Sequence, residues 1–369
     1  MLTWNRTCWK NRVCISLCTL CCCLGFLGRE GQGQTSSSNT QGLSNAQGNS
    51  VASGNYDPLH LQSDATLPVE TLSIHYPNGK REVPVRIYQP NGTSISGVIL
   101  FSHGLGGTNQ VNAFLASHWS SRGYVCVFLQ HPGSDESVWR GKALGTRMDA
   151  MRGAASGTQF TARIEDVHVV LDQLEQWDRD PQSKWKGRFP LEHVGMSGHS
   201  FGAITTQAVS GQNYPLIGQK YLNARIDAAL LLSPSPPAAG SVEKAFDRVP
   251  IPWMLMTGTR DSSTIGVSNP QDRMKLFPHL PKNIDRYQLV LDEARHSAFT
   301  DSRLPEDGLQ RKNPNHHRVM LAYSTAFWDS YLKEDPAAKA WLQGEEAKSL
   351  LERRDEWQVL KQGQSYSHP

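Results

Sequence analysis

One stretch decides the fold of this chain, Val194-Gly-Met-Ser-Gly-His-Ser-Phe-Gly-Ala203, in which residues 198–202 match the pattern G-x-S-x-G. A β-rich run leads into the motif and a small-residue helical pattern follows, which predicts a tight strand-to-helix turn with Ser200 at its tip. Gly198 and Gly202 are expected there because a Cβ at either place would clash where the backbone doubles back. Ser200 is therefore the candidate nucleophile, and the alternative is an ordinary serine in a glycine-rich turn.

Short runs rich in β-branched and aromatic residues alternate with helical patterns along the chain. Two runs are expected to form an antiparallel edge, Val69–His75 and Val83–Tyr88. The others are expected to form buried parallel strands: Gly97–Ser102, Tyr124–Leu129, Val194–Met196, Ala228–Leu232, Trp253–Thr257 and Tyr287–Leu291. This alternation predicts an α/β domain over residues 56–334, with a mostly parallel central sheet and helices on both faces.

Helices are expected where apolar residues recur at intervals of three and four. The clearest such stripe is formed by Ile164, Val167, Leu171 and Leu174, and it is typical of a helix packed on a sheet. Further candidate helices cover residues 109–121, 201–209 and 316–332.

Two segments do not fit the alternation. Ser134–Gly157 is a long connection rich in Gly, Ala and Arg, and it is the candidate for a lid over the site. Residues 335–369 carry Trp341, Leu350, Leu351 and Trp357 among many charges, which predicts a polar helical tail docked on the domain.

The first 28 residues have the layout of a secretory signal peptide. They are basic at Arg6, Lys10 and Arg12 and then apolar from Val13 to Leu27. This apolar run is shorter than the ~20 residues that a membrane-spanning helix needs. We therefore expect export directed by a signal peptide over residues 1–28, with an uncleaved membrane anchor through residues 13–27 as the alternative. Residues 29–55, poor in apolar side chains, are expected to form a flexible linker.

The charge of the chain limits the classes of binding partner, and its cysteines limit the possible disulfides. Removal of residues 1–28 takes away three bases and no acid, so the formal charge of +3 becomes 0. A chain without excess positive charge is not expected to bind nucleic acid. Of the seven cysteines only Cys126 lies outside the first 28 residues, so an exported form has no internal disulfide.

Metal and nucleotide signatures are missing from the sequence. It contains no H-E-x-x-H or paired Cys and His spacing, and no G-x-G-x-x-G or Walker loop. We expect neither a metal ion nor an organic cofactor.

A glycine-rich loop offers hydrogen-bond donors to a developing oxyanion. The run Phe101-Ser-His-Gly-Leu-Gly-Gly107 follows an expected strand, and a serine nucleophile needs backbone N–H groups aimed at the negative charge. The N–H groups of Leu105 and Phe201 are the candidates for this oxyanion hole. The alternative for residues 103–106 is a plain turn.

The acid and the base should follow Ser200 in the order Asp, His. Asp261 comes just after the strand expected at 253–257, at the end where open α/β sheets build their sites. His296 follows the next expected strand. Of the rival carboxylates, Asp227 precedes a strand and so lies at the wrong end, and Asp292 shares a loop with His296.

Three further residues are candidates for contact with the substrate: Gly106, His199 and Trp139. His199 is expected to pack beside the site. For His131, which ends a strand, a structural role is expected.

At these residues the chain resembles the dienelactone hydrolase-like and platelet-activating-factor acetylhydrolase-like branch of the α/β-hydrolases, which includes bacterial cutinase-like polyesterases. The resemblance covers roughly residues 66 to 334 and rests on Phe101-Ser-His-Gly-Leu-Gly106, on Ser121-Arg-Gly-Tyr-Val125 and on Gly198-His-Ser-Phe-Gly202. It implies the α/β-hydrolase fold. These motifs identify the superfamily much better than the substrate.

The chain departs from this pattern in two places. Dienelactone hydrolases have a cysteine nucleophile where this chain has Ser200, which argues against lactone opening. The animal acetylhydrolases carry their acid after the strand that follows the nucleophile elbow, the G-x-S-x-G turn at residues 198–202. At that place this chain reads Leu232-Ser-Pro-Ser-Pro236 without a carboxylate. The resemblance therefore implies an acid on a later strand, as in the polyesterases, and this favours Asp261.

Together these features predict a secreted serine hydrolase that cleaves carboxylic esters through an acyl-enzyme. The expected partner is a small-molecule or lipid ester, and the oligomeric state stays open. A phospholipase A2-like acetylhydrolase activity is the alternative substrate class. A non-catalytic α/β-hydrolase used as a binding module is the alternative from another class.

Overall fold

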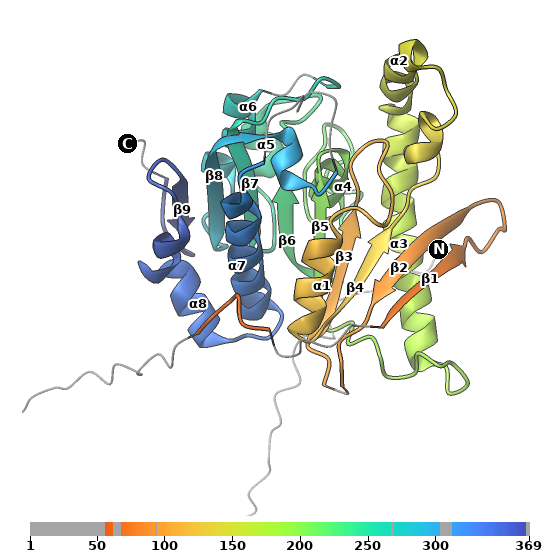
Figure 1. Cartoon of the computed structure of the whole chain (residues 1–369), viewed down its shortest axis with the longest axis horizontal. Coiled ribbons are helices and arrows are strands. Elements are labelled where there is room, and N and C mark those ends of the chain that lie inside the picture. Colours follow the sequence, from red (N-terminus) through yellow and green to blue (C-terminus); the bar gives the residue numbers. More distant parts are fainter. Residues whose placement is uncertain (1–55, 62–67, 93, 267–268, 303–311, 367–369) are drawn as a thin grey trace, which may run out of the picture. The chain divides into compact units, whose positions relative to one another are not determined.

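The computed structural model describes residues 56–61, 68–92, 94–266, 269–302 and 312–366 (Figure 1). The expected signal peptide (1–28) and linker (29–55) lie outside these residues. Within the described ranges, no helix combines the length and the apolar character that crossing a membrane requires.

A nine-stranded sheet in the order β1-β2-β4-β3-β5-β6-β7-β8-β9 forms the centre of the domain. Its six inner strands, from β4 to β8, run parallel, whereas β1 and β2 at one edge and β9 at the other are antiparallel to their neighbours. The strands are β1 (Val69–His75), β2 (Glu82–Tyr88), β3 (Gly97–Ser102), β4 (Tyr124–Leu129), β5 (Val194–His199), β6 (Ile226–Leu232), β7 (Trp253–Arg260), β8 (Arg286–Arg295) and β9 (Glu356–Leu360). The expectation of a mostly parallel sheet in an α/β domain is confirmed.

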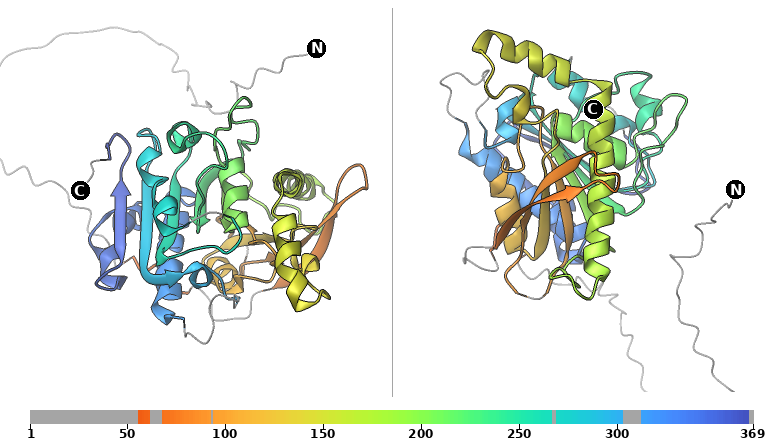
Figure 2. Two further views of the ribbon diagram at one scale, coloured as in Figure 1. Left: turned by 90° about the horizontal axis from the view of Figure 1, so that it is seen from above. Right: turned by 90° about the vertical axis from the view of Figure 1, so that its right-hand side faces the viewer.

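Helices cover both faces of this sheet, as the two views of Figure 2 show. The α-helices are α1 (Ala113–Ser121), α2 (Leu144–Ala154), α3 (Gly157–Arg179), α4 (Phe201–Val209), α5 (Val242–Phe246), α6 (Pro270–Met274), α7 (Pro314–Tyr331) and α8 (Pro336–Gln343). Short 3-10 helices are η1 (Glu136–Val138), η2 (Phe277–His279), η3 (His296–Phe299) and η5 (Glu346–Leu350).

Side-chain alternation along the strands builds two core layers. On β3, Ile99 and Phe101 pack in the cluster that also holds residues of α1 and α7, whereas Val98 and Leu100 pack with α3. Successive side chains of a strand point to opposite faces, so a strand covered on both faces reads as a continuous apolar run. This is why β3 and β4 are buried along their whole length.

The stripe expected from the sequence forms the buried face of α3. Ile164, Val167, Leu171 and Leu174 are all at most 2% exposed and pack on the sheet. Arg163 lies on the same buried face and is 0% exposed. A fully buried arginine needs polar partners, and those partners are described with the site.

The tail holds more than the helix expected over residues 335–369. After α8 and η5 the chain forms β9, which pairs antiparallel with β8 from Arg286↔Leu360 to Val290↔Glu356 and completes the sheet. Trp341 and Leu342 lie in the main core cluster. The description as a polar helical tail is therefore incomplete. The sequence of β9 is short, lies among charged residues and shows only weak alternation of apolar and polar side chains. It therefore does not indicate a strand unless its pairing with β8 is known.

Candidate active site

Ser200 stands on the turn that the sequence predicts. It lies between β5 and α4 with φ 57° and ψ −115°, a backbone conformation that costs a non-glycine residue free energy. A Cβ at Gly198 would lie 2.3 Å from the carbonyl oxygen of Gly202, and one at Gly202 would lie 1.8 Å from that of Ser102. Both glycines are therefore required where β5 turns into α4, beside the end of β3.

The structure brings Ser200, His296 and Asp261 into one hydrogen-bonded chain. Nε2 of His296 lies 2.8 Å from Oγ of Ser200, and Nδ1 of the same ring lies 2.7 Å from Oδ1 of Asp261. Asp261 follows β7 and His296 begins η3 directly after β8, both at the carboxyl edge of the parallel strands. His296 and Asp261 are buried, whereas Ser200 is partly exposed. A substrate can therefore reach the hydroxyl while the base stays shielded from water.

Asp261 is held as a carboxylate by its neighbours. Burial by itself raises the pKa of this carboxyl. His296 and then Arg273 lower the pKa by a larger amount, so that it falls to about 2. Thr257 donates its hydroxyl to Oδ2 at 2.9 Å, and Nε of Arg273 lies 3.3 Å from Oδ1. An ionised acceptor fixes the proton of His296 on Nδ1 and leaves Nε2 free to accept a proton from Ser200.

Neither rival carboxylate reaches the base. Asp227 accepts the backbone N–H of Val194 at 2.9 Å, at the amino end of β5, which is the wrong end of the sheet. Asp292 accepts the hydroxyl of Thr259 at 3.2 Å. The geometry therefore pairs His296 with Asp261.

The glycine-rich loop lies directly against the elbow. A Cβ at Gly104 would contact Cβ of Ser200 at 3.5 Å. Among the described residues, the backbone N–H groups of Leu105 and Phe201 have no hydrogen-bond acceptor. Phe201 also opens α4, whose amino end favours negative charge. Two unpaired donors next to a serine hydroxyl form an arrangement suited to a tetrahedral oxyanion.

The loop donor at Leu105 is polarised by its own peptide unit. Its N–H shares that unit with the carbonyl of Gly104, which accepts from the N–H of Gly107 at 3.0 Å and from Nδ1 of His103 at 2.6 Å. Because hydrogen bonds polarise one another, these two donors strengthen the N–H of Leu105 as a donor.

The residues expected to contact substrate lie around this loop. Trp139, on the segment 134–157, donates its indole N–H to the carbonyl of Gly106 at 2.8 Å. Gly106 has φ +74°, and a Cβ there would lie 2.6 Å from Cε of Met151 on α2. The segment expected to form a lid, which holds η1 and α2, thus begins against the glycine-rich loop at residues 103–107, the candidate oxyanion loop. Figure 1 shows α2 at the carboxyl edge of the sheet.

His199 packs beside the triad, as expected from its place in the elbow. Its ring centroid lies 4.7 Å from that of His296, and its Nε2 donates to the carbonyl oxygen of His296 at 3.1 Å. Burial, and then the nearby His296, lower the pKa of His199 well below its ordinary value. His199 is therefore a neutral packing partner of the base.

Two buried arginines at this site, Arg163 and Arg273, were not expected from the sequence. Arg273, on α6, donates to the backbone carbonyls of Asp261 at 2.9 Å and of Ser233 at 2.8 Å. Nothing local marks Arg273, because α6 spans only five residues. Arg163 had one signal, since it stands four residues before Val167 on the apolar stripe of α3.

A scan against protein-family models finds no match, and neither does a search of the curated proteins. No group of three or more metal-ligating side chains is found within the described ranges.

Proposed function

We propose that this chain is a serine hydrolase of the α/β-hydrolase fold that cleaves carboxylic esters through an acyl-enzyme. One observation carries the proposal: the hydrogen-bonded chain from Oγ of Ser200 through His296 to Asp261, beside two N–H groups that have no acceptor among the described residues. The chain order Ser, Asp, His and the strand-turn-helix around Ser200 favour this fold among those that carry such a triad.

In the acylation step, Oγ of Ser200 attacks the ester carbonyl carbon while Nε2 of His296 takes the hydroxyl proton. The carbonyl oxygen becomes an oxyanion, which the N–H groups of Leu105 and Phe201 stabilise. Collapse of this intermediate breaks the bond to the alkoxy oxygen, which takes the proton from His296 and leaves as an alcohol. Asp261 stays ionised throughout, because its pKa is about 2.

Deacylation repeats the sequence with water. His296 takes a proton from a water molecule whose oxygen attacks the acyl carbon, and the same two N–H groups hold the second oxyanion. The bond to Oγ then breaks, and Ser200 regains its proton from His296. The products are a carboxylic acid and the free enzyme.

For the substrate we propose an ester with a short or oxidised acyl chain. Trp139 and Met151 stand against Gly106, so the segment 134–157 leaves little room directly over the oxyanion loop. Export of the chain is part of the proposal and rests on the sequence of residues 1–28.

A fluorophosphonate probe and a series of p-nitrophenyl esters of graded acyl length test the proposal. Oγ of Ser200 displaces fluoride from the probe, so wild type is expected to gain the mass of one probe less HF, and it should hydrolyse the shortest esters fastest. Ser200→Ala takes up no probe and loses hydrolysis about 10⁴-fold or more. Ser210→Ala, a serine at the end of α4 that bonds only within its own helix, is the matched control and keeps wild-type activity.

Three outcomes contradict parts of the proposal. Equal hydrolysis by wild type and Ser200→Ala rejects the mechanism. An unlabelled, inactive wild type indicates a non-catalytic binding module. Preference for phospholipid micelles over soluble short esters replaces the substrate class with that of an acetylhydrolase.

A further inference from the structure

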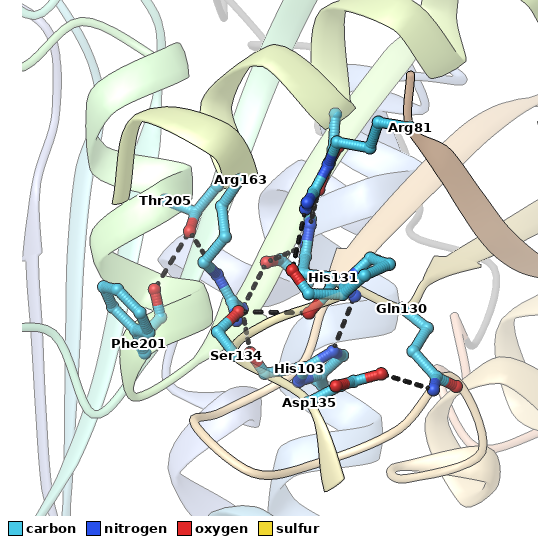
Figure 3. Close-up of polar contacts among 12 residues, drawn as sticks. Arg81, His103, Gln130, His131, Ser134, Asp135, Arg163, Phe201 and Thr205 are labelled. Atoms are coloured by element: carbon cyan, nitrogen blue, oxygen red, sulfur yellow. Dashed lines mark hydrogen bonds and ion pairs between the residues drawn. The ribbon is translucent and has the colours of Figure 1, made fainter. Parts of the chain in front are cut away.

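A buried arginine stands behind the oxyanion loop. Arg163 lies on α3 and is 0% exposed, and its guanidinium lies 4.7 Å from the ring centroid of Phe201 (Figure 3). The side chain therefore reaches from α3 to the first residue of α4, whose N–H is one of the two candidate oxyanion donors. Within the described part of the chain, Arg163 makes no hydrogen bond to Ser200 or His296.

Its guanidinium joins three parts of the site. Nε donates to Oγ1 of Thr205 on α4 at 3.1 Å, and one terminal nitrogen donates to Oγ of Ser134, where the segment 134–157 begins, at 2.9 Å. The other terminal nitrogen donates to Oγ of Ser102 at 3.0 Å and to the backbone carbonyl of His103. The acceptors thus belong to the elbow helix, the candidate lid and the oxyanion loop (Figure 3).

All of these acceptors are neutral. Among the described residues, no carboxylate lies within ion-pairing distance of Arg163. Burial lowers its pKa to about 9, against the opposite effects of Asp166 and Asp135. The group is therefore still cationic near pH 7, and a buried cation is costly unless its hydrogen bonds are all made. This cost favours the one arrangement of loop and helix that supplies every acceptor.

A series of hydrogen bonds behind Arg163 fixes the orientation of the Ser102 hydroxyl, which accepts from Arg163. Ser102 accepts from Arg163, so its own proton goes to Nε2 of His131 at 2.9 Å. Nδ1 of His131 then donates to Asp166 at 2.9 Å, and Asp166 also accepts from Arg81 on the other side. Burial, and then the charge of Arg163, lower the pKa of His131 to about 4, which leaves the ring neutral and able to accept from Ser102.

The loop itself is tied to the same series of hydrogen bonds. Nδ1 of His103 must carry a proton, because it lies 2.6 Å from the carbonyl oxygen of Gly104. Its Nε2 is then free to accept the backbone N–H of His131 at 3.0 Å. The loop is thus held at its start by Arg163 and, through the ring of His103, by the backbone of His131 just after β4.

We propose that Arg163 is a positioning residue that fixes the oxyanion loop 103–107 against α4, so that the N–H groups of Leu105 and Phe201 converge on one point. The inference rests on the proposed function, because that function assigns the oxyanion to these two donors. The planar guanidinium of arginine reaches acceptors in three directions, which the single ammonium group of lysine cannot do. Lysine at this position therefore keeps the charge but loses the arrangement.

Hydrogen exchange tests the positioning without a substrate. In Arg163→Gln and Arg163→Lys, amides of the peptide that covers residues 103–107 are expected to exchange about tenfold faster than in wild type. Arg122→Gln is the matched control. Arg122 is also buried, but it binds Asp329 and lies just before β4. It is therefore at the amino ends of the parallel strands, away from the site at their carboxyl ends. It should speed exchange around residues 118–124 and leave 103–107 unchanged.

Ester hydrolysis tests the consequence for the oxyanion. Both Arg163 variants are expected to lower kcat about 10²-fold with KM within about threefold, because oxyanion donors act in the transition state. Binding of a boronic acid, which forms a tetrahedral adduct with a serine, should weaken in parallel with kcat. A purely structural role would instead lower the active fraction and leave kcat per labelled site and boronate affinity unchanged.

Two single-acceptor variants keep the test decisive if the Arg163 variants do not fold. Thr205→Val and Ser134→Ala each remove one acceptor hydroxyl, and combined they should speed exchange at 103–107 and lower kcat by about tenfold. Unchanged exchange in this double variant overturns the positioning role, whether or not the wild type hydrolyses esters. Faster exchange in a chain whose wild type hydrolyses nothing supports the positioning role and rejects the proposed function.

Discussion

A methyl group added to Gly202 would lie 1.8 Å from the carbonyl oxygen of Ser102. The two residues are distant in sequence, but they stand side by side because β3 pairs with β5 up to Ser102↔Gly198. The carbonyl of the next residue, His103, accepts from Arg163. The contact therefore sets how closely the elbow approaches the oxyanion loop, which makes the glycine a requirement of tertiary packing as well as of the local turn.

Gly202→Ala is expected to destabilise the fold by about 3 kcal/mol or to displace β3, because the clash is with backbone rather than with a flexible side chain. Urea unfolding measures the change. Gly153→Ala is the matched control, since Gly153 lies within α2 and a Cβ there meets nothing within 4 Å. It should be neutral or stabilising by up to about 1 kcal/mol. Equal effects of the two substitutions would contradict the close approach.

Strain at the nucleophile gives a second prediction. Ser200 has φ 57°, so Ser200→Gly should be more stable than Ser200→Ala by about 1 kcal/mol, because glycine adopts this conformation without cost. Thermal unfolding of both inactive variants measures the difference. At Ser210, with φ −110° at the end of α4, the order should reverse, with alanine the more stable. Glycine less stable than alanine at both positions would show that Ser200 is not strained.

The acid assignment is tested with two carboxylates. Asp261→Asn should lower kcat about 10⁴-fold in the protein that folds, because an amide no longer fixes the proton of His296 on Nδ1. Asp292→Asn is the control, because its carboxylate binds Thr259 and not the base. It should keep wild-type kcat. Loss of activity in Asp292→Asn alone would reverse the assignment.

The stability of the fold should decrease in acid because of Asp166, which belongs to the hydrogen-bonded series behind the oxyanion loop. Burial raises the pKa of Asp166, but bonds from Arg81 and His131 lower it more, from the ordinary 3.8 to about 2. A lowered carboxyl pKa stabilises the fold above about pH 4, and this contribution of about 2 kcal/mol is lost as pH falls from about 4 to 2. The stability gap between wild type and Asp166→Asn should therefore shrink over that range.

Urea unfolding at pH 7 and pH 2.5 measures this gap. Asp172→Asn, which changes an exposed carboxylate on the same helix, should match wild type at both pH values. A gap that stays constant with pH would mean that Asp166 does not carry this dependence.

Trp139 offers a test of the segment over the loop. Trp139→Phe removes the indole N–H that binds Gly106 but keeps an aromatic ring, so KM should rise about threefold to tenfold, as expected for one lost hydrogen bond. Trp177→Phe is the control, because Trp177, on α3, stacks on Trp185, which lies beyond the end of that helix. Steady-state kinetics with a short ester separate the two. Unchanged KM in Trp139→Phe would remove this residue from the substrate site.

The local patterns of the sequence predicted most of the parallel sheet and several helices. The bounds expected for β1, β3, β4 and α4 agree with the structure, because those segments have a strong apolar period or a turn motif of their own. The strand β9 was not expected, because its few apolar residues gain their burial only by pairing with β8. The residues that complete the site, Arg163 and Arg273, carry no motif.

From the sequence alone came the identity of the candidate nucleophile, acid and base, because each follows a strand pattern that can be read within a few residues. Only the tertiary structure decided that Ser200, His296 and Asp261 meet, that Asp292 does not, and that Arg163 ties the oxyanion loop to α4. The physical reason is that a buried charge is stabilised by acceptors from several elements at once. The apolar period of one helix or strand does not indicate which other elements will supply those acceptors.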